Sequence, residues 1–366
     1  MVSKLQKLPE DLGILGWDSI SPTFFCAWIA GIPCVFIGDP GAAKTTFQVR
    51  FARALDLKLD VLDLQYLSTT RLLGIPNPEL LKKSVLEYVG GLLSTKPDVV
   101  ILDELNRCQD QVQGIILEFL REGRLNNSYL KCKRVASCNP PANNLVGVHY
   151  LDYAQATRLV HIPIPNLSIS LREQFIDDWN VQFVTSPETK ELCQELNSLE
   201  LLKPNPAHVK SIAIALLDSF NNIPVSGRQI DLLLRLLTAS WTLEASGFHS
   251  FTGLDIARLG SSNIPFQLTR NSWNITDGEL FATQMSKKLP DFPWKSEEVI
   301  KTQNLSVQVE QTQMKFQLME IESIIPHCKG TSLENFIAFE VFVAKAASDP
   351  RFHVEFDNWN LLEKLR

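Results

Sequence analysis

The sequence predicts an α/β fold in which helices alternate with the strands of a largely parallel sheet. Residues 32–37 are apolar and partly β-branched, as in a strand buried on both faces, and further strands are expected at 58–64, 99–102, 134–137 and 160–164. Between them, residues 45–57 and 112–120 place apolar side chains at helical spacing. Alternation of strands with helices is typical of parallel sheets, because parallel neighbours need a crossover connection.

The chain changes character after Pro165. Strand signals become few, and four segments with Leu and Ile at helical spacing follow: 167–180, 187–202, 206–221 and 226–246. Leu289–Trp294 contains two prolines and is expected to be a linker, and Thr331–Glu334 has the form of a capping box that opens a helix reaching Ala347. We therefore expect three parts: a core at 1–165, a helical lid at 166–272 and a mixed, mainly helical C-terminal region at 273–366.

The composition is that of an ordinary globular protein. Its 366 residues, 45% hydrophobic and 21% charged, suffice for two or three apolar cores. The formal net charge is −6 and no Lys/Arg blocks occur, so a nucleic-acid partner is not expected. Seven scattered cysteines without a CxxC pair indicate reduced thiols. No apolar run is long enough for a bilayer, and the first residues lack a signal-peptide core, so we expect a cytoplasmic location without membrane attachment.

A glycine-bearing turn, GDPGAAKTT, follows the first predicted strand and precedes a helix. This is the context of a phosphate-binding loop, in which backbone N–H groups converge on phosphates at a helix N-terminus. The candidate nucleotide-binding residues are Gly38, Asp39, Pro40, Gly41, Ala42, Ala43, Lys44, Thr45 and Thr46. Lys44 supplies a charge for the β and γ phosphates, and the Thr45 hydroxyl a ligand for Mg²⁺. Ala43 stands where glycine is usual, and its methyl group is tolerated if the residue has helical or extended backbone angles.

A second motif, VVILDELNR at 99–107, is a hydrophobic strand that ends in two carboxylates. Asp103 at the strand tip is expected to hold Mg²⁺ through its water shell, and Glu104 to act as general base on the attacking water. Two adjacent acids alone are also compatible with a polar strand edge or a helix start. Their position one or two strand–helix units after the phosphate loop favours nucleotide hydrolysis.

These two motifs, together with ILEFLREGRL, VASCNP and LDYAQATRLVHIPIP, resemble the MoxR branch of the AAA+ ATPases. The resemblance covers about residues 15–165 well and extends more loosely to about 260. In that family the loop often carries alanine before the lysine, so Ala43 is family-like. The resemblance implies a P-loop AAA+ core that binds ATP and Mg²⁺ and hydrolyses ATP to ADP and phosphate.

The resemblance also implies roles for three residues. Asn139 in SCNPP matches the sensor-1 residue that orients the attacking water; an Asx turn is the alternative. Arg158 in QATRL matches an arginine that reaches the γ-phosphate of a neighbouring subunit, although Thr157 and Leu159 replace the usual Asp and Phe. Arg228 in VSGRQ matches the sensor-2 arginine of the lid. A surface position is the alternative for both arginines.

Two further assignments rest on the same resemblance. Arg107, in the LNR after the two acids, is a candidate for action across a subunit boundary. Gly74 and the segment 114–128 match sites of loop insertions that face a central pore in this branch.

The resemblance finally implies a homo-oligomeric ring, a hexamer, that remodels or activates a protein client. MoxR-like proteins commonly work with a partner bearing a von Willebrand A domain, and the DxSxS signature of that domain is absent here, so the partner is expected to be a separate protein. A nucleic-acid motor or restriction-type NTPase is the main alternative. It calls for basic pore loops, and the nearest cluster, Lys131, Lys133 and Arg134, indicates a solvated hairpin face. A non-hydrolysing ring subunit is disfavoured by the complete set of lysine, threonine and two acids.

Overall fold

The computed structural model describes residues 3–84, 88–125, 128–140, 156–177, 183–218, 225–263, 282–287 and 289. All of them belong to the first of two units into which the chain divides, Met1–Val299. The expected linker, apart from Leu289, and the helix expected at 331–347 lie outside the described residues.

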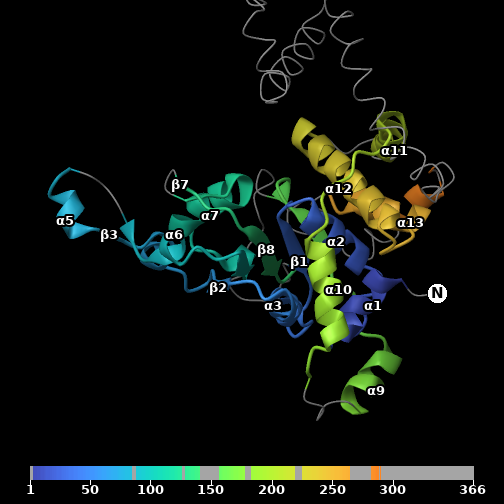
Figure 1. Ribbon diagram of the computed structural model, residues 1–366, viewed down its shortest axis with the longest axis horizontal. Helices are drawn as coiled ribbons and strands as arrows, with labels where there is room; N and C mark the ends of the chain where they lie inside the picture. The colour runs from blue at the N-terminus through green and yellow to red at the C-terminus, as the bar shows by residue number, and fades with distance from the viewer. Residues whose placement is uncertain are drawn as a thin grey trace, which may run out of the picture. The chain divides into compact units, whose positions relative to one another are not determined.

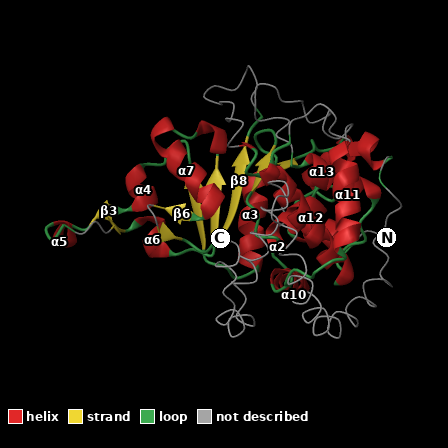
Figure 2. Ribbon diagram, turned by 90° about the horizontal axis from the view of Figure 1, so that it is seen from above, coloured by secondary structure: helices red, strands yellow, loops and turns green. Residues whose placement is uncertain are grey.

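The core of the fold is a five-stranded sheet in which all neighbours are parallel (Figure 2). In spatial order its strands are β2 (Leu59–Asp63), β5 (Val99–Asp103), β8 (Lys133–Cys138), β1 (Cys34–Ile37) and β9 (Val160–Pro163). Each corresponds to one predicted strand. The α/β fold class with a parallel sheet is therefore confirmed.

The register of the strands brings their carboxyl ends to one edge of the sheet. β1 and β8 end in register at Ile37 and Cys138, and β2 and β5 end in register at Asp63 and Asp103. The phosphate-loop candidate begins directly after Ile37, and Asn139 directly follows Cys138. Ligands of open α/β sheets bind outside the carboxyl ends of the strands, so the fold itself gathers the candidate residues where a ligand binds.

Both faces of the sheet are covered by helices (Figures 1 and 2). In β1, Cys34 and Phe36 belong to one buried core, and Val35 and Ile37 to a second. The first core contains side chains of α1 (Lys4–Asp11), α2 (Ser21–Ile29), α3 (Lys44–Ala54), α10 (Pro187–Asn197), α11 (Pro206–Asp218), α12 (Gly227–Ala245) and α13 (Gly253–Ser261). The second contains those of α4 (Thr69–Leu73), α6 (Gly91–Thr95) and α7 (Asp110–Glu122).

An aromatic cluster packs α3 against the sheet. The Phe24 ring on α2 lies 5.3 Å from Phe36 on β1, and 5.2 and 5.4 Å from Phe47 and Phe51 on α3, measured between ring centroids. All four are at most 1% exposed. Each such pair contributes about 0.5–1.5 kcal/mol beyond its buried area. The first turn of α3, which carries the lysine and threonine of the loop, is thereby held in place.

The helices after β9 agree with the predicted segments. α9 (Ile169–Asp177), α10, α11 and α12 lie within the four segments expected after Pro165. α12 packs against α2, α11 and α13, and Arg235 on α12 donates 2.7 Å to the Ala30 carbonyl oxygen at the end of α2. The apolar core on this side is therefore continuous between the sheet and these helices.

Two short hairpins lie at the positions that the resemblance marks as sites of loop insertions, Gly74 and 114–128, although their strands were not predicted. β3 (Ile75–Pro76), α5 (Pro78–Leu81) and β4 (Tyr88–Val89) lie between α4 and α6 and project away from the sheet (Figures 1 and 2). We call the described residues of this segment, 75–84 and 88–89, the arm. Gly74 at its base has φ 96°, and a Cβ there would lie 2.5 Å from the Val89 carbonyl oxygen, so only glycine fits. The second hairpin, β6 (Arg124–Leu125) with β7 (Ser128–Tyr129), follows α7.

The basic cluster at the start of β8 differs from the expected solvated face. Lys133 Nζ donates to the Trp28 carbonyl oxygen and lies 5.3 Å from the Trp28 ring centroid. Arg134 donates 3.0 Å to the Phe119 carbonyl oxygen. Burial lowers the pKa of Lys133 to about 8. Lys131 is exposed as expected. Lys133 and Arg134, in contrast, donate to carbonyl groups near the C-terminal ends of α2 and α7.

Two general features concern the helices and the cysteines. Among the described helices, none has both the length and the apolar content that a bilayer crossing requires. The six described cysteines are all free thiols.

Candidate functional site

The loop between β1 and α3 needs its two glycines for different reasons. A Cβ on Gly38 would lie 2.8 Å from Cβ of Ile164, closer than real Cβ atoms approach, so the chain can pass there only without a side chain. Gly41 has φ 83°, a backbone conformation that glycine adopts without strain. Asp39 and Pro40 are exposed between them. The loop therefore has the close approach and the sharp turn that a phosphate-binding loop requires.

Ala43 departs from the expected backbone conformation. It has φ 59° and ψ 20°, in the left-handed region, and is the N-cap residue of α3. The expectation of helical or extended angles is wrong, because the loop turns into the helix at this residue and needs a positive φ to do so. An alanine in this region costs roughly 1–2 kcal/mol, so the site carries local strain where a glycine would carry none.

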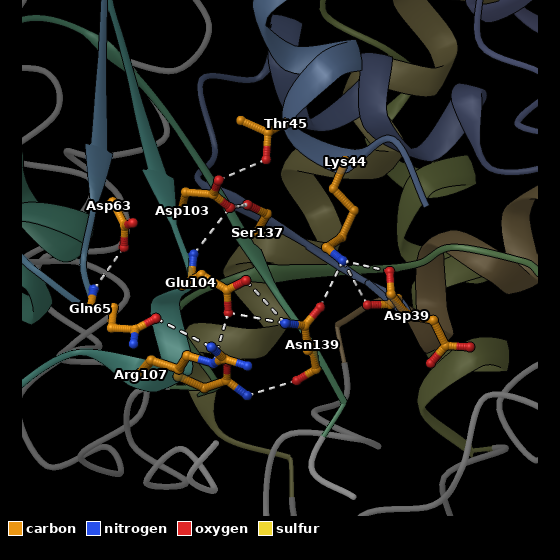
Figure 3. A network of polar contacts seen from close by, with 12 residues as sticks. Asp39, Lys44, Thr45, Asp63, Gln65, Asp103, Glu104, Arg107, Ser137 and Asn139 are labelled. Atoms are coloured by element: carbon orange, nitrogen blue, oxygen red, sulfur yellow. Dashed lines mark hydrogen bonds and ion pairs between the residues drawn. The ribbon is translucent and has the colours of Figure 1, made fainter. Parts of the chain in front are cut away.

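Lys44 is the first residue of α3 and its ammonium group is enclosed by oxygen atoms. Nζ donates to the carbonyl oxygens of Gly38 and Asp39, at 2.7 and 2.9 Å, and to Oδ1 of Asn139 at 2.9 Å (Figure 3). The residue is 8% exposed. Burial lowers its pKa below the ordinary value, while nearby carboxylates, including that of Glu104, act in the opposite direction. The three donors of the ammonium group are thus all engaged, and the charge is aimed at the loop.

Thr45 and Asp103 meet at the carboxyl edge of the sheet, as the magnesium-site prediction requires. Thr45 Oγ1 donates 2.8 Å to Asp103 Oδ2, and Ser137 on β8 donates to the other carboxylate oxygen (Figure 3). No cluster of three or more His, Cys, Asp or Glu side chains occurs in the described part of the chain. A hydroxyl beside one carboxylate fits Mg²⁺, which takes oxygen ligands and is held by one or two carboxylates together with substrate phosphates.

Glu104 follows β5 in a strained conformation. Its φ and ψ are 54° and 47°, in the left-handed region, which places its side chain apart from that of Asp103. Both carboxylate oxygens accept from Asn139 Nδ2, at 3.1 and 3.0 Å, and Oε2 lies 3.2 Å from Arg107 Nε. Non-glycine residues in this region cluster at active sites, where surrounding contacts determine them. The two acids of the motif therefore face different partners, as two different roles require.

Asn139 connects the lysine to the general-base candidate. Its Oδ1 accepts from Lys44 and its Nδ2 donates to Glu104 (Figure 3). The side chain is 2% exposed, and its backbone carbonyl oxygen accepts 2.7 Å from Asn106 Nδ2. A buried amide that spans a cation and an anion is held in one orientation by both, which argues against the Asx-turn alternative.

Three contributors to this network escaped sequence reasoning: Ser137, Asn106 and Gln65. Ser137 is fully buried in an otherwise apolar stretch of β8, and that polar residue in a buried strand was a usable signal. Asn106 lies in a 3₁₀ turn, η1 (Leu105–Arg107), directly after the acids. Gln65 is distant in sequence and had no signal.

The remaining site predictions fall on three positions. Thr46 is exposed one residue after Thr45. Arg158 is half-buried just before β9, and Arg228 is exposed in the first turn of α12. The roles assigned to Arg158 and Arg228 stay predictions.

The fold and the site together define a P-loop nucleotide-binding domain. A glycine-bearing loop follows the first strand of a parallel sheet of order β2-β5-β8-β1-β9, and a Thr–Asp pair meets it at the strand ends. Within that class, residues 33–155 match the AAA domain of the dynein-related subfamily, so this segment is an AAA domain.

Similarity to known proteins extends beyond this segment in structure. The crystal structure of a "putative ATPase" from Cytophaga hutchinsonii ATCC 33406 superimposes with a TM-score of 0.54, over 79% of this chain and 95% of that one. The two sequences are 18% identical, so the likeness concerns the fold. No curated protein matches the chain.

Proposed function

We propose that the protein is a MoxR-like AAA+ ATPase that hydrolyses ATP to ADP and phosphate. One observation carries the proposal. At a single edge of the sheet, a lysine, a hydroxyl–carboxylate pair and a second carboxylate are connected by hydrogen bonds through Asn139 and Asp103. Phosphoryl transfer needs these groups, because its catalysis consists of positioning and charge stabilisation.

The loop and Lys44 bind the triphosphate in this proposal. The N-terminus of α3 favours negative charge, and Nζ exchanges carbonyl oxygens of the loop for phosphate oxygens. Thr45 and Asp103 hold Mg²⁺, which when bound neutralises charge on the phosphates. Arg228 is expected to contact the nucleotide from the helical lid.

Hydrolysis then uses Glu104 as general base. The oxygen of a water molecule forms a bond to the γ-phosphorus, and the bond from that phosphorus to the β,γ-bridging oxygen breaks, so ADP leaves with that oxygen. The proton released by the water passes to the Glu104 carboxylate and from there to solvent. Asn139 orients the carboxylate and the water through its amide.

We further propose that subunits assemble into a homo-oligomeric ring, a hexamer, in the cytoplasm. Arg158 acts on the nucleotide of the neighbouring subunit, where a guanidinium stabilises transition-state charge. Nucleotide-driven movement remodels a protein client, with a separate von Willebrand A-domain protein as partner. The free cysteines are compatible with a reducing compartment. The inward-facing Lys133 and Arg134 do not favour the alternative of a nucleic-acid motor.

Steady-state hydrolysis of Mg·ATP tests the enzymatic part. Lys44→Ala is expected to lower turnover by about 10²-fold or more, since it removes the charge on the phosphates. Lys131→Ala, which removes an exposed lysine, is the matched control and should leave turnover unchanged. Equal rates in wild type and Lys44→Ala would refute the site. Stimulation by single- or double-stranded DNA would favour the motor alternative.

Mixed assemblies test the action of Arg158 across subunits. Arg158→Ala and Lys44→Ala subunits are each inactive alone in this proposal. Mixing them creates interfaces in which an intact loop meets an intact arginine, so hydrolysis should recover in part. Absence of recovery at every ratio would contradict action in trans.

A further inference from the structure

A polar relay reaches Glu104 from a turn that the proposed mechanism does not use. Arg107 Nε lies 3.2 Å from Glu104 Oε2, and another nitrogen of the same guanidinium, Nη1, donates 3.2 Å to Gln65 Oε1 (Figure 3). Gln65 belongs to the turn between β2 and α4, 42 residues earlier in the chain. The guanidinium thus bridges the carboxylate and a second, distant segment.

The turn that carries Gln65 is itself held at several points. The Gln65 N–H donates 3.0 Å to Asp63 Oδ1, and its carbonyl oxygen accepts 3.3 Å from Gln109 Nε2. The Tyr66 N–H donates to the Asp63 carbonyl oxygen. Residues 107 and 109, which both precede the first residue of α7, therefore hold the turn from one side. The side chain of Gln65 is half-buried, so its amide is presented to Arg107 in a defined position.

The Glu104 carboxylate needs the contact with Arg107, because the contact with Asn139 alone leaves the carboxylate free to rotate. Asn139 Nδ2 lies about equally far from both oxygens of Glu104, at 3.1 and 3.0 Å, and so does not distinguish them. The Arg107 guanidinium meets the carboxylate at Oε2 as an ion pair, with Nε 3.2 Å away but outside hydrogen-bond geometry. Misplacement of a catalytic group by about 1 Å can cost roughly 10²-fold in rate.

We propose, on the basis of the proposed ATPase function, that Arg107 is a positioning residue for Glu104 of its own subunit and that Gln65 positions Arg107. The Arg107 guanidinium sets which carboxylate oxygen is available to the water, and Gln65 fixes the plane of the guanidinium. Arg107 therefore acts within its chain and not across a subunit boundary.

Kinetics of four variants test the relay. Arg107→Ala is expected to lower kcat about 10- to 100-fold, and Gln65→Ala about 3- to 10-fold, because each loosens the carboxylate. The affinity for Mg·ATP should stay within about 2-fold, since neither residue belongs to the phosphate loop. Arg107→Lys keeps a cation for Glu104 but cannot reach both partners, so it should retain more activity than Arg107→Ala. Arg53→Ala, an exposed arginine in the last turn of α3, is the control and should change nothing.

A double-mutant cycle separates a relay from two independent effects. Gln65→Ala should have no further effect on kcat in the Arg107→Ala or Arg107→Lys background. Additive losses, or a kcat of Arg107→Ala within 2-fold of wild type, would overturn the inference while leaving the ATPase proposal intact. Loss of ATP affinity in place of kcat would also overturn it. If Arg107→Ala does not fold, Gln65→Ala and Arg107→Lys still decide the matter, because the turn is at the surface and the lysine keeps the charge.

Mixed assemblies decide between action within and across subunits. Arg107→Ala subunits combined with Lys44→Ala subunits should not recover hydrolysis, since each carries a defect in its own site. Recovery would overturn action in cis. A wild-type protein that does not hydrolyse Mg·ATP would overturn the proposed function and the relay together. This result differs from each outcome above, because in those the wild type is active.

Discussion

Glycine in the interior of a helix usually lowers the free energy of unfolding. Because Ala43 has a left-handed backbone conformation, we predict the opposite sign for glycine at this position. Ala43→Gly changes one methyl group at the N-cap of α3, where φ is 59°. Ala52→Gly makes the same change in the interior of the same helix, at a residue that is 1% exposed. Only backbone conformation and burial differ, so the two variants form a matched pair.

The expected change in the free energy of unfolding of Ala43→Gly is the sum of three contributions. Relief of the left-handed conformation contributes roughly 1–2 kcal/mol to the free energy of unfolding at position 43. The added freedom of glycine in the unfolded chain costs about 0.4–1 kcal/mol, and a half-buried methyl group about 0.4 kcal/mol. The net change is between about −0.4 and +1.2 kcal/mol. At Ala52 there is no strain to relieve, and the helix-interior penalty of about 1 kcal/mol adds to the loss of a buried methyl, about 0.8 kcal/mol.

Urea unfolding of both variants at one pH measures the difference directly. We expect Ala43→Gly to match or exceed the wild type and to be about 2 kcal/mol more stable than Ala52→Gly. Equal destabilisation of the two variants would refute the reasoning, since it would mean that residue 43 is not strained.

Three further predictions concern other positions. Burial raises the pKa of Glu244 from its ordinary value of 4.5 to about 7. The unfolded chain therefore loses this proton first as pH rises, and stability falls between about pH 4.5 and 7. Glu244→Gln should raise the free energy of unfolding by about 1–2 kcal/mol at pH 8, allowing for partial solvation, and by less at pH 5; a larger gain at pH 5 in urea titrations would contradict this. Gly38→Ala should destabilise the fold by about 1–3 kcal/mol because its Cβ would meet Ile164, and a neutral result in the same assay would disprove the close contact. Asn139→Asp keeps an acceptor for the lysine but sets a carboxylate against that of the general base, so turnover should fall at least about 10²-fold with the lysine contact retained; turnover near wild type would remove Asn139 from the network.

The central strands could be predicted because they are short and buried on both faces. Such strands need continuous apolar residues, as Val99–Leu102 and Cys34–Ile37 illustrate, whereas the edge strand β2 is largely half-buried and carries Asp60. The order of the strands had no comparable signal, because pairing depends on contacts between distant segments. The strands of the arm were missed for a different reason, although a loop insertion was expected at Gly74. These strands contain two residues each, too few for any alternation to show.

The site was predictable where chemistry follows directly from a strand end. Lys44, Thr45, Asp103 and Glu104 each lie next to a predicted strand or helix, so the parallel topology brings them together. The backbone angles of Ala43 were not predictable, because they depend on how the loop enters α3.

Contacts between residues far apart in the sequence could not be predicted, for a related reason. The pairing of Arg107 with Gln65 joins residues 42 apart in sequence, and neither type is unusual for a loop. Lys133 and Arg134 have the composition of a solvated face, yet carbonyl groups of α2 and α7 take up their charges. In both cases the deciding contact comes from another element of the fold.

Single-turnover hydrolysis by Glu104→Gln tests the central claim most directly. Glutamine has the size of glutamate but cannot take a proton from water. We predict that the variant binds Mg·ATP with near wild-type affinity and that its rate of cleavage falls by about 10²- to 10⁴-fold. Cleavage at the wild-type rate would contradict the account.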